Sequence, residues 1–328
     1  MDSRTRPSLA SDLHNCCRFR QHHVFFQQGA KQKAVVEITE RVRSFLVPQI
    51  LVQNKALMAD PQPSIVSETS SQPLRLPEEQ QVLFREILSL LEERRVPYAI
   101  AGAFALQEHT GIRRDTKDLD LFLTAENALR ALETLRDEGF HCEVCDPVWL
   151  YKAHRDGFFV DLITGMSNAA IVVEDEWIRH SKPAVVHGVH CRVLAAEELL
   201  ASKLFVTRRE RFDGADIAHV IYATRGQLNW QRIMQLAGEN WEMLFWALVL
   251  FRYAYPAQTQ FVPPELWNEL IKRFEQVISH PDPKARFRGS LIDDKMFAID
   301  VNEWGLDNLM RESRLHRLEQ LPQTRTPS

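Results

Sequence analysis

The sequence predicts an α+β fold, with a small mixed sheet and flanking helices followed by a helical C-terminal region. Between residues 78 and 195, helical spacings of apolar residues alternate with short apolar runs typical of strands. After residue 196 only the helical pattern recurs. Residues 60–73 are rich in Pro, Ser and Gln and contain too few apolar residues to pack, which is typical of a linker.

These patterns divide the chain into four parts. We expect an N-terminal extension and linker at 1–77, a sheet-containing core at 78–195, a helical domain at 196–319 and a loose tail at 320–328. Strands are predicted at 97–101, 117–124, 158–163 and, as a hairpin about Gly188, at 184–186 and 190–194. Helices are predicted at 78–94, 104–109, 126–138, 196–209, 213–224, 230–240, 242–253 and 264–278.

The overall composition narrows the class of protein. Hydrophobic residues make up 45% of the 328-residue chain, enough for a substantial core. The net charge of −4 argues against a globally basic nucleic-acid-binding surface. The sequence contains neither a membrane-spanning apolar run nor a secretory signal, so we expect a cytoplasmic protein whose five cysteines are reduced.

The N-terminal extension differs from the rest of the chain. A helix is expected near residues 35–51, and we interpret Met58 as the true translation start, which would leave residues 1–57 untranslated. The alternative is a metal-binding knuckle, although its ligand spacing matches no common zinc pattern. Its candidate ligands are His14, Cys16, Cys17, His22 and His23.

Two carboxylates stand two residues apart in the strand predicted at 117–124. Side chains at i and i+2 leave the same face of a strand, so Asp118 and Asp120 share one face while Leu119, Leu121 and Leu123 take the other. Two neighbouring negative charges are unfavourable unless a cation neutralises them, and Mg²⁺ prefers oxygen ligands. The pair therefore indicates half of a metal site, most commonly used in phosphate chemistry.

The order of features around this pair resembles a known superfamily. A strand runs into Gly102-Ala103, a short helix follows, and then comes Thr116-Lys117-Asp118-Leu119-Asp120. This order resembles the nucleotidyltransferase superfamily typified by DNA polymerase β. The specific sequence Thr-Lys-Asp-Leu-Asp is similar to that of the bacterial AbiEii-type nucleotidyltransferases, which include toxins of toxin–antitoxin systems. The resemblance covers roughly residues 96–217. It implies a polymerase-β-like core and nucleotidyltransferase activity.

The resemblance also implies a third carboxylate on a neighbouring strand. Asp161 fits, because it lies in the apolar run Phe159-Val160-Asp161-Leu162-Ile163. A lone carboxylate on an apolar face is expensive unless it is paired or bound to metal. The alternative is a strand-end aspartate that caps a turn or pairs with an arginine.

Three carboxylates of this kind imply two-metal chemistry. By resemblance, Asp118, Asp120 and Asp161 bind two Mg²⁺ ions, which Mn²⁺ can replace, together with a nucleoside triphosphate (NTP), ATP among the candidates. The acceptor hydroxyl would belong to RNA or a tRNA end, a protein or a small molecule, and an antitoxin protein is a further expected partner. The alternatives are antibiotic-type nucleotidyl transfer and a non-catalytic member of the fold that binds a nucleotide or a partner.

The resemblance assigns further residues to nucleotide binding. Gly102 allows the backbone to approach phosphates, while Ala103 replaces the Gly or Ser usual at that position. Lys203 lies toward the apolar side of its predicted helix, so it either reaches phosphates or snorkels at the rim of the core. Arg208 and Arg209, with the neighbouring Arg211, would bind triphosphate or an RNA backbone, or form a solvated face.

Four residues are expected to support the site. Thr116 and Lys117 flank the carboxylate strand, and Asp213 and Asp216 would orient Lys203 or an arginine, or cap the next helix. The Cys-x-x-Cys spacing at residues 142–145 lacks a second ligand pair and is interpreted as packing within a strand.

Overall fold

The computed structural model describes residues 76–114, 116 and 118–322. The predicted N-terminal helix, the linker up to residue 73, Met58 and the His/Cys group lie outside the described residues, as do Asp115, Lys117 and residues 323–328. Residues 76–270 and 283–322 belong to one compact unit, while 271–282 belong to another and enter here only as the end of a helix. In the described ranges, every helix is too short or too polar to cross a membrane.

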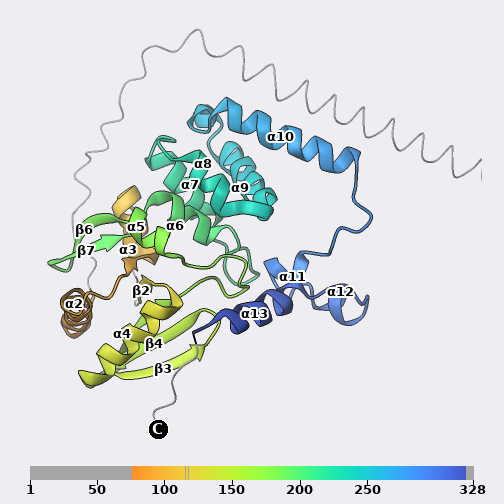
Figure 1. Cartoon of the computed structure of the whole chain (residues 1–328). Coiled ribbons are helices and arrows are strands. Elements are labelled where there is room, and N and C mark those ends of the chain that lie inside the picture. The colour runs from red at the N-terminus through yellow and green to blue at the C-terminus, as the bar shows by residue number, and fades with distance from the viewer. Residues whose placement is uncertain (1–75, 115, 117, 323–328) are drawn as a thin grey trace, which may run out of the picture. The chain divides into compact units, whose positions relative to one another are not determined.

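Seven strands form one mixed sheet in the order β3-β4-β5-β2-β1-β7-β6 (Figure 1). Strands β2 and β5 pair in parallel, as do β1 and β7, and the other neighbours are antiparallel. The strands are β1 (Ala99–Ile100), β2 (Leu119–Phe122), β3 (His141–Asp146), β4 (Leu150–Arg155), β5 (Phe158–Ile163), β6 (Lys182–Val186) and β7 (Val189–Val193).

The apolar face of the central strand forms because of its alternating sequence. Leu119, Leu121 and Leu123 have no exposed surface, so this face of β2 lies in the core. Helix α4 (Ala125–Asp137) follows, and the side chain of Thr124 caps it by accepting a hydrogen bond from the backbone N–H of Asn127.

Helices flank the sheet and make up the region that follows it. Those within the sheet-containing part are α2 (Glu78–Glu93), α3 (Gly102–Thr110), α4 and α5 (Asp175–His180). Those that follow are α6 (Ala196–Lys203), α7 (Gly214–Ala223), α8 (Trp230–Ala237), α9 (Trp241–Ala254), α10 (Pro264–Ser279), α11 (Gly289–Ile292), α12 (Ala298–Asn302) and α13 (Leu309–Gln320). Two 3-10 helices, η2 (Gly238–Asn240) and η3 (Pro256–Phe261), flank α9. The predicted α+β class is therefore confirmed, while the domain boundary at residue 195 stays a prediction.

The predicted helix at 196–209 was too long. Helix α6 ends at Lys203, and the chain then makes a tight turn that pairs Thr207 with Phe212. The backbone N–H of Asp213 donates to the carbonyl of Val206 at 2.8 Å, which closes the turn. Consecutive β-branched Val206 and Thr207 favour this extended backbone over helix. Strand β4 and helix α5 are further elements that the sequence analysis did not predict.

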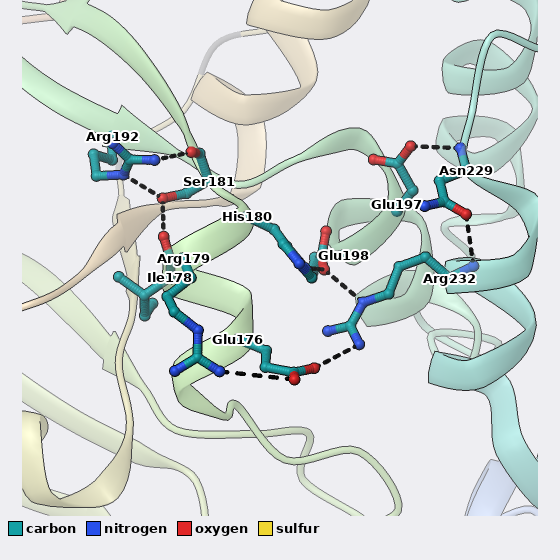
Figure 2. A network of polar contacts seen from close by, with 10 residues as sticks. All are labelled: Glu176, Ile178, Arg179, His180, Ser181, Arg192, Glu197, Glu198, Asn229 and Arg232. Atoms are coloured by element: carbon teal, nitrogen blue, oxygen red, sulfur yellow. Dashed lines mark hydrogen bonds and ion pairs between the residues drawn. The ribbon is translucent and has the colours of Figure 1, made fainter.

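A polar network joins α5, α6 and α8 (Figure 2). Glu198 is only 1% exposed, and its Oε1 accepts from Nε of Arg232 at 3.0 Å and lies 3.1 Å from Nδ1 of His180. Nη1 of Arg232 also reaches Oε2 of Glu176 at 2.9 Å. Because a buried carboxylate needs such partners, the network holds α6 in place, and α6 carries Lys203 at its end.

The segment around α11 packs back onto the sheet-containing part. Nδ2 of Asn168 donates to the carbonyl of Leu291 at 2.8 Å. Arg314 of α13 donates to the carbonyl of Ser167 at 2.7 Å and to Oδ2 of Asp146 at 2.9 Å. These bonds attach the C-terminal helices of this unit to the loop after β5 and to the end of β3.

Candidate active site

Two of the three predicted carboxylates lie side by side. Strands β2 and β5 pair in parallel with Asp120 directly opposite Asp161, so both side chains leave the same face of the sheet. Asp118 precedes β2 by one residue and shares this face, because Leu119 between them is fully buried on the other. Strand register thus brings together residues that are 41 positions apart.

The electrostatics of Asp120 reflect this crowding. Burial raises the pKa of Asp120 to about 6, and the negative charges of Asp161 and Asp118 add to the rise. The nearby positive charges of Arg211 and Lys203 oppose it. A cation bound among these carboxylates would remove the repulsion, so the donor set suits a hard divalent ion.

Thr116 fixes the backbone of Asp118. Its hydroxyl donates to the carbonyl of Asp118 at 3.0 Å and lies 3.3 Å from the backbone N–H of the same residue. Such local bonds hold the chain in a defined turn before the strand. Lys117, the other predicted flanking residue, lies outside the described residues.

Gly102 packs directly against Asp120. Its φ is +56°, a left-handed conformation, and a β-carbon placed on it would overlap Oδ2 of Asp120. The backbone N–H of Ala101 donates to the carbonyl of Asp120 at 2.8 Å. Glycine is required at this point because the first turn of α3, with half-buried Ala103 next in the chain, lies against the carboxylate strand.

Lys152 is a site residue that the sequence analysis missed. It lies on β4 directly opposite Asp161, and its Nζ is 2.5 Å from Oδ1 of Asp161 and 3.9 Å from the centre of the Phe159 ring. Burial raises the pKa of Asp161, and the hydrogen bond and charge of Lys152 act against that rise. No motif marks Lys152, and the register of β4 against β5 alone places it there.

Lys203 is buried with two acids rather than extended into solvent. Its Nζ lies 2.8 Å from Oδ2 of Asp213 and 2.7 Å from Oδ2 of Asp216. Arg211 binds both carboxylate oxygens of Asp213 at 3.0 and 2.9 Å, and Arg114 pairs with Asp216. Burial alone would raise the pKa of Asp213, but the bonds from Arg211 and Lys203 lower it below its usual value.

The other two arginines of the cluster have different neighbours. Arg208 contacts the hydroxyl of Ser167, and the backbone N–H of Arg209 is 3.4 Å from Oδ2 of Asp293. Both contacts join the turn after α6 to the segments that pack against it. Of the three arginines, Arg211 is the one whose charge acts on Asp120.

The structure therefore gathers most predicted site residues in one place. The three carboxylates, Gly102 and the charges of Lys203 and Arg211 lie within electrostatic reach or in direct contact. Asp213 and Asp216 are linked to this group through Lys203. The side chain of Arg208 is engaged with Ser167 instead.

Part of the chain is similar to a known protein family. Residues 81–240 match a protein-family model described as a nucleotidyl transferase of unknown function, DUF2204. No curated protein matches the chain.

Several solved structures show a weak likeness. The solution structure of the antibiotic-resistance factor ANT(2'')-Ia has 18% identity and a TM-score of 0.38, covering 55% of this chain and 100% of that one. The lincomycin-bound lincosamide antibiotic adenylyltransferase LnuA has 19% identity and a TM-score of 0.31, covering 43% and 95%. An antigenic nucleotidyltransferase-like protein from Paracoccidioides brasiliensis has 16% identity and a TM-score of 0.37, covering 57% and 94%.

The family match contains every residue of the carboxylate group and the cations Lys203 and Arg211 that act on Asp120. Asp118, Asp120 and Asp161 lie within residues 81–240, as do Lys203 and Arg211. The part of the chain that builds the candidate site is thus the part that is similar to a nucleotidyl transferase family.

Proposed function

We propose that this chain is a Mg²⁺-dependent nucleotidyltransferase that moves a nucleoside monophosphate from an NTP to a hydroxyl group and releases pyrophosphate. One observation carries the proposal. Asp120 and Asp161 stand opposite each other in register, with Asp118 on the same face. Burial, together with the charges of Asp161 and Asp118, raises the pKa of Asp120.

The residues present fit the metal that this chemistry requires. Asp118, Asp120 and Asp161 would hold Mg²⁺, or Mn²⁺ in its place, because carboxylate oxygens are the ligands that these ions prefer. When bound, the ions would neutralise the triphosphate and lower the pKa of the acceptor hydroxyl.

The chain's own residues would position the triphosphate. The missing side chain of Gly102 lets the first turn of α3 lie directly against the Asp120 carboxylate, and helix N-termini favour anions. Lys203 and Arg211 supply positive charge near the carboxylates. The acceptor hydroxyl would lose its proton to solvent, and its oxygen would bond to the α-phosphorus. The bond from that phosphorus to the oxygen that bridges it to the β-phosphate would break, so that pyrophosphate leaves.

The test uses the full chain with each α-³²P-labelled NTP, Mg²⁺ and one acceptor class at a time: total bacterial RNA, bacterial protein or antibiotic. Asp118→Asn with Asp120→Asn removes two charges at the site. Asp156→Asn is the matched control, since Asp156 is exposed in the turn between β4 and β5. We expect Mg²⁺-dependent labelling with the wild type and the control, and none with the double variant.

Each outcome separates the candidate functions. Label on RNA would identify an RNA-modifying enzyme, and tRNA as the labelled species would favour a toxin-like role with an antitoxin partner. Label on an antibiotic would favour small-molecule transfer. No labelling and no Mg²⁺-dependent NTP binding would overturn the proposal in favour of a non-catalytic protein.

A further inference from the structure

Two histidines and a glutamate meet on β3 and β4, next to the strand pair that carries the carboxylates. His141 on β3 lies directly opposite His154 on β4, and their ring centres are 5.1 Å apart. Glu143 is two residues along β3, so its side chain leaves the same face as His141.

The donor atoms of these residues are already close together. One ligand atom from each of His141, Glu143 and His154 lies within 4.8 Å of the others, and Nε2 of His154 is 3.3 Å from Oε1 of Glu143. Ligands of a tetrahedral Zn²⁺ ion with bonds near 2 Å are about 3.3 Å apart. The site therefore has to contract by roughly 1.5 Å at most, which side-chain rotation can supply.

The polar atoms at this cluster are poised for a ligand. Nε2 of His154 is buried and lacks a hydrogen-bond partner among the described residues, because its contact with Glu143 does not have hydrogen-bond geometry. The thiol of Cys145 lies 3.2 Å from Oε1 of Glu143, where it donates to that oxygen and orients the carboxylate.

We propose that His141, Glu143 and His154 form a binding site for one divalent transition-metal ion, with Zn²⁺ as the expected occupant. Three protein ligands from a two-strand ribbon leave an open coordination position for water. The two imidazole nitrogens select Zn²⁺ over Mg²⁺, which prefers oxygen ligands.

This site adjoins the carboxylate group on the same face of the sheet but uses different ligands. The charge of His154 acts on Asp161. Lys152 lies opposite Asp161 on one side and opposite Glu143 on the other, so its positive charge stands between the two acids. Zn²⁺ binding at the histidines does not depend on the proposed nucleotidyl transfer.

The test measures tight Zn²⁺ binding to the full, tag-free chain by competition with a chromophoric chelator. His and Cys residues in the N-terminal part of the sequence are also zinc-binding residue types. The measured quantity is therefore the difference in Zn²⁺ stoichiometry and affinity between the wild type and each variant. We expect His141→Ala, a change at an exposed residue, to lose one ion per chain or weaken its binding by at least roughly tenfold. His190→Ala, an exposed strand histidine on β7, is the matched control and should bind as the wild type does.

A second readout locates the ion directly. Zn²⁺ should protect His141 and His154 from carbethoxylation, mapped by mass spectrometry of peptides, whereas Mg²⁺ at millimolar concentration should not. Equal Zn²⁺ stoichiometry and affinity in the wild type and His141→Ala, or unprotected histidines at saturating Zn²⁺, would overturn the proposal. Glu143→Gln, which keeps the shape of the side chain, should also weaken binding.

Discussion

Nζ of Lys152 lies 2.5 Å from Oδ1 of Asp161, across the neighbouring strands β4 and β5. The protein's own cation thus occupies an oxygen that the proposed function assigns to a metal ion. Lys152 and Mg²⁺ are expected to compete for Asp161, since both are attracted to the same carboxylate.

Lys152→Met should therefore change how Mg²⁺ affects stability. Without divalent ions we expect the free energy of unfolding to fall by about 1–3 kcal/mol, because a largely buried carboxylate loses its partner. With Mg²⁺ added, the variant should gain more stability than the wild type. Urea denaturation with EDTA and with Mg²⁺ measures both effects. Lys182→Met, at an exposed lysine of β6, is the control, and an equal Mg²⁺ effect in all three proteins would contradict the competition.

The raised pKa of Asp120 predicts a pH dependence of stability in metal-free buffer. Its pKa is about 6 in the folded protein and near 3.9 when unfolded, so the folded state binds the proton more tightly. The stabilising effect of this proton is complete below about pH 4 and is lost as the pH rises through 6, by up to about 3 kcal/mol.

Asp120→Asn, which carries no charge at any pH, should lack this loss. With EDTA present, we expect the variant to gain stability relative to the wild type between pH 4.5 and pH 7.5. Chemical denaturation at several pH values gives the difference, and Asp156→Asn is the control. A constant difference across this range would show that Asp120 is not the titrating group.

Gly102→Ala should disrupt the site by collision as well as by backbone strain. The new β-carbon would overlap Oδ2 of Asp120, so we expect loss of nucleotidyl transfer and a destabilisation larger than that of a strained glycine alone. Gly111→Ala is the matched control, because Gly111 also has positive φ, +70°, but a β-carbon added there would meet nothing within 4 Å.

Removal of the colliding carboxylate provides the decisive comparison for Gly102. In the Asp120→Ala background, Gly102→Ala should cost less unfolding free energy than in the wild type, as a double-mutant cycle measures. Additive effects of the two substitutions would indicate that the glycine is needed for its backbone conformation alone.

Lys203→Met should strongly destabilise the fold. Lys203 forms ion pairs with Asp213 and Asp216, whose side chains are 9% and 5% exposed. Its loss leaves these buried negative charges incompletely neutralised, so we expect the free energy of unfolding to fall by about 3–5 kcal/mol. Urea denaturation measures the loss. The triple variant that adds Asp213→Asn and Asp216→Asn should recover part of the stability, whereas no recovery would argue against the charge explanation.

Much of the fold and of the candidate site follows from short-range patterns in the sequence. The alternation in 117–124 predicted that Leu119 and Leu121 leave the face opposite that of Asp118 and Asp120, and the burial of both leucines agrees. The helical spacing at 78–94 predicted α2 to within one residue. These features depend on neighbours two to four positions apart, which the sequence displays directly.

The tertiary structure decided which distant residues meet. That β5 pairs with β2, that Lys152 faces Asp161, and that His154 faces His141 all depend on strand order and register. Strand β4 has no strong alternation, and the end of α6 at Lys203 depends on a turn that packs against other segments. The sequence by itself determined the chemical groups and the face of each strand that bears them. Their partners were decided by packing, because contacts between residues far apart in the chain form only when the whole core assembles.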